Sequence, residues 1–167
     1  MPSEKVLLQK QQAVADLKAK IEASVSGVLV DYKGINVAND TKMRRELREA
    51  GVEYAVYKNS TIRFALTGTS FADLTKHLDG TTAVALSATD ATAPARIIAK
   101  YAKETKEGFN IKGGFVESDV MDAAGIEAVA SIPSREVLLS QLCGGLNGVI
   151  RNLAVVLDQI REQKEAC

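Results

Sequence analysis

The sequence predicts an α/β fold, with a mixed sheet covered by helices and a long C-terminal helix after it. Short runs rich in β-branched residues alternate with longer segments whose apolar residues recur every three to four positions. Glycines separate many of these segments, as at Gly34, Gly51 and Gly80. After Pro133 a helical pattern continues to the end of the sequence. Alternating strands and helices are typical of a layered α/β domain.

Each predicted element is bounded by residues that start or stop regular structure. Ser3 is a candidate N-cap of the first helix, Gly51 suits the position after the second, and Pro94 suits the first turn of a later one. The predicted helices cover about 3–23, 37–50, 59 onward, 71–78, 94–106, 121–131 and 134–167. The predicted strands cover 26–32, 52–58, 81–88 and 109–117.

Composition supports one packed domain with a helical extension. Apolar residues make up 46% of the 167 residues and Trp is absent, so the core is expected to be aliphatic. We place the boundary at Pro133, which gives an α/β domain over 1–133 and a long amphipathic helix over 134–167. Ser134 is the expected N-cap of that helix.

Several kinds of chemistry lack their usual signature. The sequence has no phosphate-binding or dinucleotide-binding glycine loop. Cys143 and Cys167 are too few for a disulfide framework or a metal cage, and the single His77 suits a polar position at a helix end. The N-terminal segment is charged rather than a secretory signal, and no apolar run is long enough for a membrane span. We therefore expect a cytoplasmic protein that is not an enzyme and needs no cofactor or metal.

Charge is unevenly distributed although the net charge is zero. Residues 1–66 hold 11 Lys and Arg against 8 Asp and Glu, whereas residues 67–133 hold 6 against 9. A local basic face, rather than a basic protein, is what such a chain offers to RNA.

The second predicted helix gathers three arginines on one flank. At 100° per residue, Arg44, Arg45 and Arg48 fall between about 100° and 200° from Met43, which marks the buried side. Guanidinium groups suit forked recognition of phosphate. The alternative is an ordinary solvated face in which these arginines form ion pairs within the helix.

Two strand-to-helix turns carry further cations. The segment DYKGINV supplies Lys33, Gly34 and Asn36, and YKNSTIR supplies Lys58, Asn59 and Arg63. Strand ends at one edge of a sheet tend to cluster, and helix starts offer free backbone N–H groups to anions. These turns are therefore candidate RNA-binding positions. Asn59 has the alternative role of a helix cap.

The final helix carries one apolar stripe about 45 Å long. The stripe either folds back on the domain or lies along other chains, as an anchor helix or a homomeric coiled coil. Gly144, Gly145 and Gly148 weaken the helix near the start of the stripe. The stripe consists of Leu138, Leu139, Leu142, Leu146, Val149, Ile150, Leu153, Val156, Leu157 and Ile160.

Taken together, these segments resemble the bacterial large-subunit ribosomal protein ten family, the anchor of the ribosomal stalk. The likeness rests on the order of Tyr32-Lys33-Gly34, the Arg-rich helix ending in Glu49-Ala50-Gly51, and Val56-Tyr57-Lys58-Asn59-Ser60. It continues through IKGGFVES and PSREVLLSQL, and so covers nearly the whole chain. Ser60 stands where the family more often has Thr.

The resemblance implies a structural, cytoplasmic protein of the large ribosomal subunit. It implies binding to the stalk-base region of large-subunit rRNA, beside large-subunit protein eleven. It also implies that the final helix carries dimers of the acidic stalk proteins seven/twelve, which recruit translational GTPases. RNA contact then falls on Lys33, Gly34, Arg44, Arg48, Lys58 and Asn59, whereas Asn36, Arg45 and Arg63 are added from geometry. The alternative is an α/β interaction module that homodimerises through its last helix.

Overall fold

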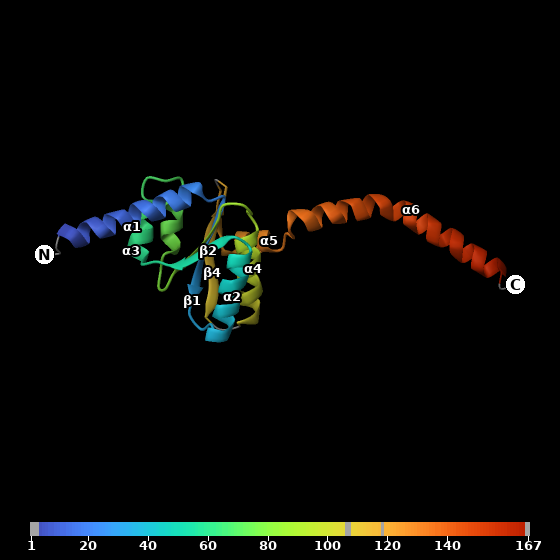
Figure 1. The fold of residues 1–167 in the computed structure, drawn as a ribbon, viewed down its shortest axis with the longest axis horizontal. Coiled ribbons are helices and arrows are strands. Elements are labelled where there is room, and N and C mark those ends of the chain that lie inside the picture. Colours follow the sequence, from blue (N-terminus) through green and yellow to red (C-terminus); the bar gives the residue numbers. More distant parts are fainter. Residues whose placement is uncertain (1–3, 106–107, 118, 166–167) are drawn as a thin grey trace. The chain divides into compact units, whose positions relative to one another are not determined.

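The computed structural model describes residues 4–105, 108–117 and 119–165. The proposed cap Ser3, the end of the helix predicted to reach Lys106, and Cys167 lie outside these ranges. The chain divides into two compact units, Met1–Ile132 and Pro133–Cys167. Figure 1 shows the first as a sheet with helices on both faces, and the second as a single helix.

The first unit begins with helix α1 (Glu4–Ala23) and strand β1 (Ser26–Tyr32). Helix α2 (Val37–Glu49) and strand β2 (Val52–Val56) follow, and helix α3 (Asn59–Leu66) leads to the short 3₁₀ helix η1 (Ala72–His77). The rest of the unit is β3 (Ala83–Ser87), α4 (Ala93–Glu104), β4 (Phe109–Val116), β5 (Asp119–Asp122) and α5 (Ala123–Ala130). The second unit holds α6 (Arg135–Glu165).

The sheet order is β2-β3-β1-β4-β5, and its four strand pairs are all antiparallel. The predicted class, a helix-covered sheet followed by a long helix, is confirmed. The strand directions differ from the mixed sheet that was expected. The reason is that β3 lies between β1 and β2, so that these two strands run in the same direction without pairing. The sequence prediction also missed β5, which forms a short hairpin with β4.

Each face of the sheet has its own core, because side chains alternate along the strands. Val28 and Val30 of β1 point toward the layer of α2, α4 and α5, where Met43 and Leu47 are buried. Leu29 points the other way, into the layer formed by α1, α3 and η1. As the sequence predicts, the core is mainly aliphatic; Phe109 and Phe115 are its buried phenylalanines.

Candidate nucleic-acid interface

The ends of β1 and β2 lie at the same end of the sheet. Val30 and Val56 are both paired with Ala83 of the intervening strand β3. The turns that follow β1 and β2 are therefore separated by two strand spacings, roughly 10 Å. A shallow hollow of about 450 Å³ lies here, lined by Tyr32, Lys58 and the loop that precedes β3. The predicted clustering of these two turns is present in the structure.

The first turn, after β1, holds Lys33 and Gly34. Gly34 has φ 76°, a left-handed conformation that favours glycine. The turn packs against Gly108, where an added Cβ would lie 2.9 Å from the Lys33 carbonyl oxygen. Asp31 Oδ1 accepts a hydrogen bond from the Lys33 N–H at 3.3 Å. These contacts fix the backbone of the turn while the Lys33 side chain remains exposed.

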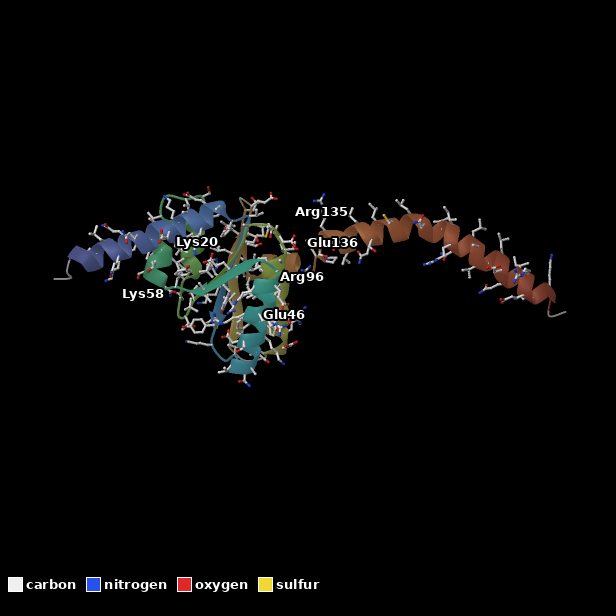
Figure 2. The ribbon with its side chains drawn as sticks, in the orientation of Figure 1. Lys20, Glu46, Lys58, Arg96, Arg135 and Glu136 are labelled. Atoms are coloured by element: carbon white, nitrogen blue, oxygen red, sulfur yellow. The ribbon has the colours of Figure 1, made fainter. Side chains whose placement is uncertain are left out.

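The second turn places Lys58 at the N-cap position of α3, with its side chain exposed (Figure 2). Asn59 is the first residue of α3 and does not cap it. Its Nδ2 donates instead to the carbonyl oxygens of Leu78 at 3.1 Å and Gly80 at 2.7 Å. Asn59 therefore ties the loop before β3 to the start of α3. The cap alternative for Asn59 is wrong, because its amide bonds to a loop some twenty residues away.

Lys112 of β4 holds the same loop from the other side, a role that the sequence analysis missed. Its Nζ donates to the carbonyl oxygens of Asp79 and Thr81 and, at 3.2 Å, to Thr82 Oγ1. The ammonium also lies 4.0 Å from Asp31 Oδ2, and its side chain is only 14% exposed. A lysine inside a largely apolar strand, FNIKGGFV, was the signal for such a role.

The arginines of α2 differ in how they are paired. Arg44 bonds to Asp40 at 2.8 Å, and its guanidinium carbon lies 4.7 Å from the centre of the Tyr54 ring in β2. Arg45 bonds to Glu49 at 2.9 Å. For these two arginines the structure contains the ion pairs of the solvated-face alternative. Arg48 is exposed and forms no ion pair with any residue that the structure describes.

The remaining predicted positions lie in different places. Asn36 is exposed at the N-cap position of α2, at the same end as the two turns. Arg48 lies in the last turn of α2, about 18 Å along the helix axis from Asn36. Arg63 is exposed in the last turn of α3, whose layer covers the opposite face of the sheet. The predicted set is thus not one compact patch.

What the structure forms instead is a strip along the edge strand β2, which we call the basic strip. It consists of Lys58 after the end of β2, Arg44 over its middle, Arg48 near its start, and Lys33 on the neighbouring turn. Lys33, Lys58 and Arg48 are exposed and have no ion-pair partner among the described residues. Such cations are available to neutralise phosphates spaced along a backbone.

The two arginines of the basic strip lie on α2, and contacts between α2 and α4 hold that helix in place. Glu46 of α2 bonds to Lys100 Nζ at 3.0 Å and accepts a hydrogen bond from the Tyr101 hydroxyl at 2.8 Å. Lys100 and then Tyr101 hold the pKa of Glu46 below its usual value. Burial, together with the bond to Glu46, raises the pKa of Tyr101 to about 12. Burial also raises the pKa of Tyr54 to about 12.

Replacing these two tyrosines by phenylalanine is expected to have different effects on stability. Tyr101→Phe removes a hydrogen bond to a carboxylate and should lower the free energy of unfolding by about 1–2 kcal/mol. The buried Tyr54 hydroxyl has no partner within the described structure, so Tyr54→Phe should be neutral or stabilising by up to about 1 kcal/mol. Urea denaturation at pH 7 measures both. If Tyr54→Phe lowers the free energy of unfolding more than Tyr101→Phe does, the Tyr54 hydroxyl has a hydrogen-bond partner, which would contradict the described structure.

The same tyrosines predict a loss of stability at alkaline pH. Phenols in the unfolded chain ionise near pH 10, whereas Tyr54 and Tyr101 keep their protons to about 12. The unfolded state therefore loses protons first, and the free energy of unfolding should fall as pH rises from about 10 to 12. Each phenylalanine variant should show a shallower fall.

Helix α6 is a separate candidate surface for a protein partner. The Ser134 carbonyl accepts the first helical hydrogen bond, from Leu138 at 3.0 Å, which agrees with Ser134 as N-cap residue. All ten residues of the predicted stripe are exposed, from 42% at Leu138 to 76% at Val149. The helix bends along its length (Figure 1). A contiguous apolar surface of this kind is a candidate site of protein interaction.

Other site types find no support in the part of the chain that the structure describes. Within the three described ranges no group of His, Cys, Asp and Glu side chains is arranged to hold a metal ion. The same ranges contain no helix with both the length and the apolar character to cross a membrane. His77 is not isolated: its Nε2 lies 3.2 Å from Asp122 Oδ1 of β5.

A basic strip on a helix-covered sheet and an apolar stripe on a separate helix are the surfaces of a protein that binds other macromolecules rather than a small substrate. Comparison with known proteins gives the family. Residues 5–103 match the family described as Ribosomal protein L10, and residues 132–166 match the Ribosomal protein uL10 C-terminal region. The chain belongs to the ribosomal protein L10 family. It is thus a ribosomal protein of the translation apparatus and not an enzyme, as the sequence predicts.

Individual relatives agree over almost their whole length. The large ribosomal subunit protein uL10 of Shouchella clausii (strain KSM-K16) is 45% identical over 161 residues, which is 96% of both chains. That of Bacillus cereus (strain B4264) is 42% identical over 161 residues with the same coverage. Both relatives are named as proteins of the large ribosomal subunit, and the predicted cytoplasmic location on that subunit agrees with the family.

Proposed function

We propose that this protein binds the stalk-base region of large-subunit rRNA through the basic strip and carries dimers of the acidic stalk proteins seven/twelve on α6. In this position it lies beside large-subunit protein eleven and anchors the dimers that recruit translational GTPases. The observation that carries the proposal is the apolar stripe of α6, since an apolar stripe of this length along one helix is typical of a helix that binds other chains. Family membership and the unpaired cations of the strip support the RNA-binding part.

The basic strip has a direct test in the salt dependence of RNA binding. Each phosphate contact contributes about 0.7–0.9 to the slope of log affinity against log salt concentration. Arg48→Ala with Lys58→Ala should therefore lower the slope by about 1.5 and weaken binding at every salt concentration. Filter binding of a stalk-base rRNA fragment between low and moderate salt measures both quantities.

Arg45→Ala with Glu49→Ala is the matched control, because this pair is exposed and its charges already satisfy each other. The control should leave the slope within about 0.3 of the original protein. If the slope of the Arg48 and Lys58 variant also stays unchanged, the basic strip is not the RNA-binding surface.

Homodimerisation through α6 is the competing function for the stripe. Sedimentation of the purified full chain distinguishes the two. A stable homodimer at micromolar concentration favours the interaction module, whereas a monomer that forms a defined complex with the acidic dimers supports the anchor.

A further inference from the structure

A second apolar surface lies between α1 and α3, in the layer opposite α2. The C-terminal half of α1 packs on α3 through Leu17 and Ile21, which are both buried. The N-terminal half leaves a hollow of about 650 Å³ against α3. Its apolar lining includes Leu7, 45% exposed, and Phe64, 69% exposed. We call this hollow the α1–α3 groove.

The groove has the length and periodicity of a helix-binding site. Leu7, Gln11, Val14 and Lys18 line it at intervals of four, three and four residues, so they form one stripe along α1. The eleven steps from Leu7 to Lys18 span about 17 Å of helix, or three turns. Phe64 lines the groove from α3 and is exposed, whereas Ile62, Ala65 and Leu66 of the same helix are buried. An occupant therefore meets an apolar floor that extends for about two helical turns of α1, from Leu7 to Val14, with Phe64 opposite.

Charge determines what kind of occupant fits. The charged residues that line the groove are Lys10 and Lys18, and no carboxylate lines it within the described residues. Lys10 has no ion-pair partner among those residues, and Lys18 reaches Glu22 only at 3.9 Å with both side chains exposed. An apolar floor with ammonium groups at its rim is complementary to an apolar helix face flanked by carboxylates.

We propose that the α1–α3 groove docks an acidic amphipathic helix of another protein. The helix lays apolar side chains on Leu7, Val14 and Phe64, and its carboxylates meet Lys10 and Lys18. This site is distinct from the stripe of α6 and from the basic strip, so it adds a third contact surface. A stacked nucleobase on Phe64 is the competing occupant. We favour the helix because the floor is largely apolar and its cations are lysines rather than arginines.

The absence of tryptophan from the sequence allows a site-specific test. In the full chain, Phe64→Trp introduces a single indole into the groove and keeps an aromatic side chain there. The probe is a Trp-free peptide of about 14 residues with leucines on one helical face and glutamates on both flanks. The comparison peptide carries lysines in place of the glutamates. Docking should shift the indole emission to shorter wavelength, with the acidic peptide at least about tenfold tighter than the basic one.

Two further variants test the role of the lysines and whether the indole signal is specific to the groove. Lys10→Glu with Lys18→Glu, in the Phe64→Trp background, should reverse the preference between the two peptides. Val37→Trp is the matched control: Val37 is 79% exposed on α2, in the opposite layer, and its indole should not respond to either peptide. Circular dichroism of all variants should match that of the original protein, because every substituted side chain lies at the surface or the rim.

Other results would overturn the proposal or assign the groove to another occupant. An unchanged emission, or equal affinity for both peptides, would overturn the proposal. A larger shift with a single-stranded oligonucleotide would assign the groove to RNA, and a shift caused by raising the protein concentration alone would assign it to a second copy of this chain. None of these readouts depends on stalk-base RNA or on α6, so failure here leaves the proposed function untouched.

Discussion

Replacing Gly114 with alanine is expected to lower the free energy of unfolding by about 3 kcal/mol or more and the melting temperature by about 10 °C or more. Gly114 lies in β4 opposite Val28 of β1. A Cβ at this position would lie closer than 3.0 Å to the Gly27 carbonyl oxygen and 3.1 Å from Ile126 Cδ1. The first of these atoms belongs to backbone within the sheet, so it cannot rotate away.

The matched control is Gly144→Ala, since a Cβ there meets nothing within 4 Å. This variant should leave the unfolding of the α/β domain unchanged and raise helix content slightly, because alanine favours a helix by about 1 kcal/mol over glycine. Thermal unfolding followed by circular dichroism measures both proteins. If Gly114→Ala costs less than about 1 kcal/mol, the close approach of β1 and β4 described above is incorrect.

Placing charge on the stripe of α6 is expected to reduce binding of the acidic stalk dimers at least about 100-fold. Leu146→Asp with Leu153→Asp replaces two leucines that the bound dimers would bury with charged side chains. Burial of a leucine contributes about 1.5–3 kcal/mol to binding. Both side chains are more than 60% exposed in the protein alone. The substitutions should therefore leave the unfolding of the α/β domain unchanged. Titration calorimetry with purified dimers measures the affinity.

The control for these substitutions adds the same charge beside the stripe. Asn147→Asp with Asn152→Asp lies outside the apolar arc of the helix, so dimer binding should stay within about threefold. Removal of residues 134–167 should abolish dimer binding while the α/β domain keeps its cooperative unfolding and its RNA affinity. Loss of cooperative unfolding would show that the stripe stabilises the domain.

Local pattern was enough to predict most elements. The prediction for β1 agrees residue by residue, and α2 differs by a single residue, because a buried strand between polar turns and a helix closed by Gly51 have strong local signals. The hairpin strand β5 was missed, since its four residues, DVMD, carry no strand-like pattern. The order of the strands has no local signal either, because it depends on contacts between distant segments.

The candidate interface was predictable in its residue types and less so in its layout. Lys33 and Lys58 were placed correctly at one end of the sheet by a rule about strand ends. Arg48 was placed with them, although the axial rise of α2 carries it toward the other end. Asn59 and Lys112 act through carbonyl groups of the loop before β3, and such partners cannot be identified until the chain has folded.

The insertion of β3 between β1 and β2 has a consequence for synthesis of the chain. Residues 26–60 contain both lysine turns, but the strand that sets their separation is made later, at residues 83–87. A nascent chain that ends before β3 holds both lysines without the strand that fixes the distance between their turns. Such long-range pairing also forms slowly. The separation of the two lysine turns is thus set only after β3 has been made and has paired with both strands.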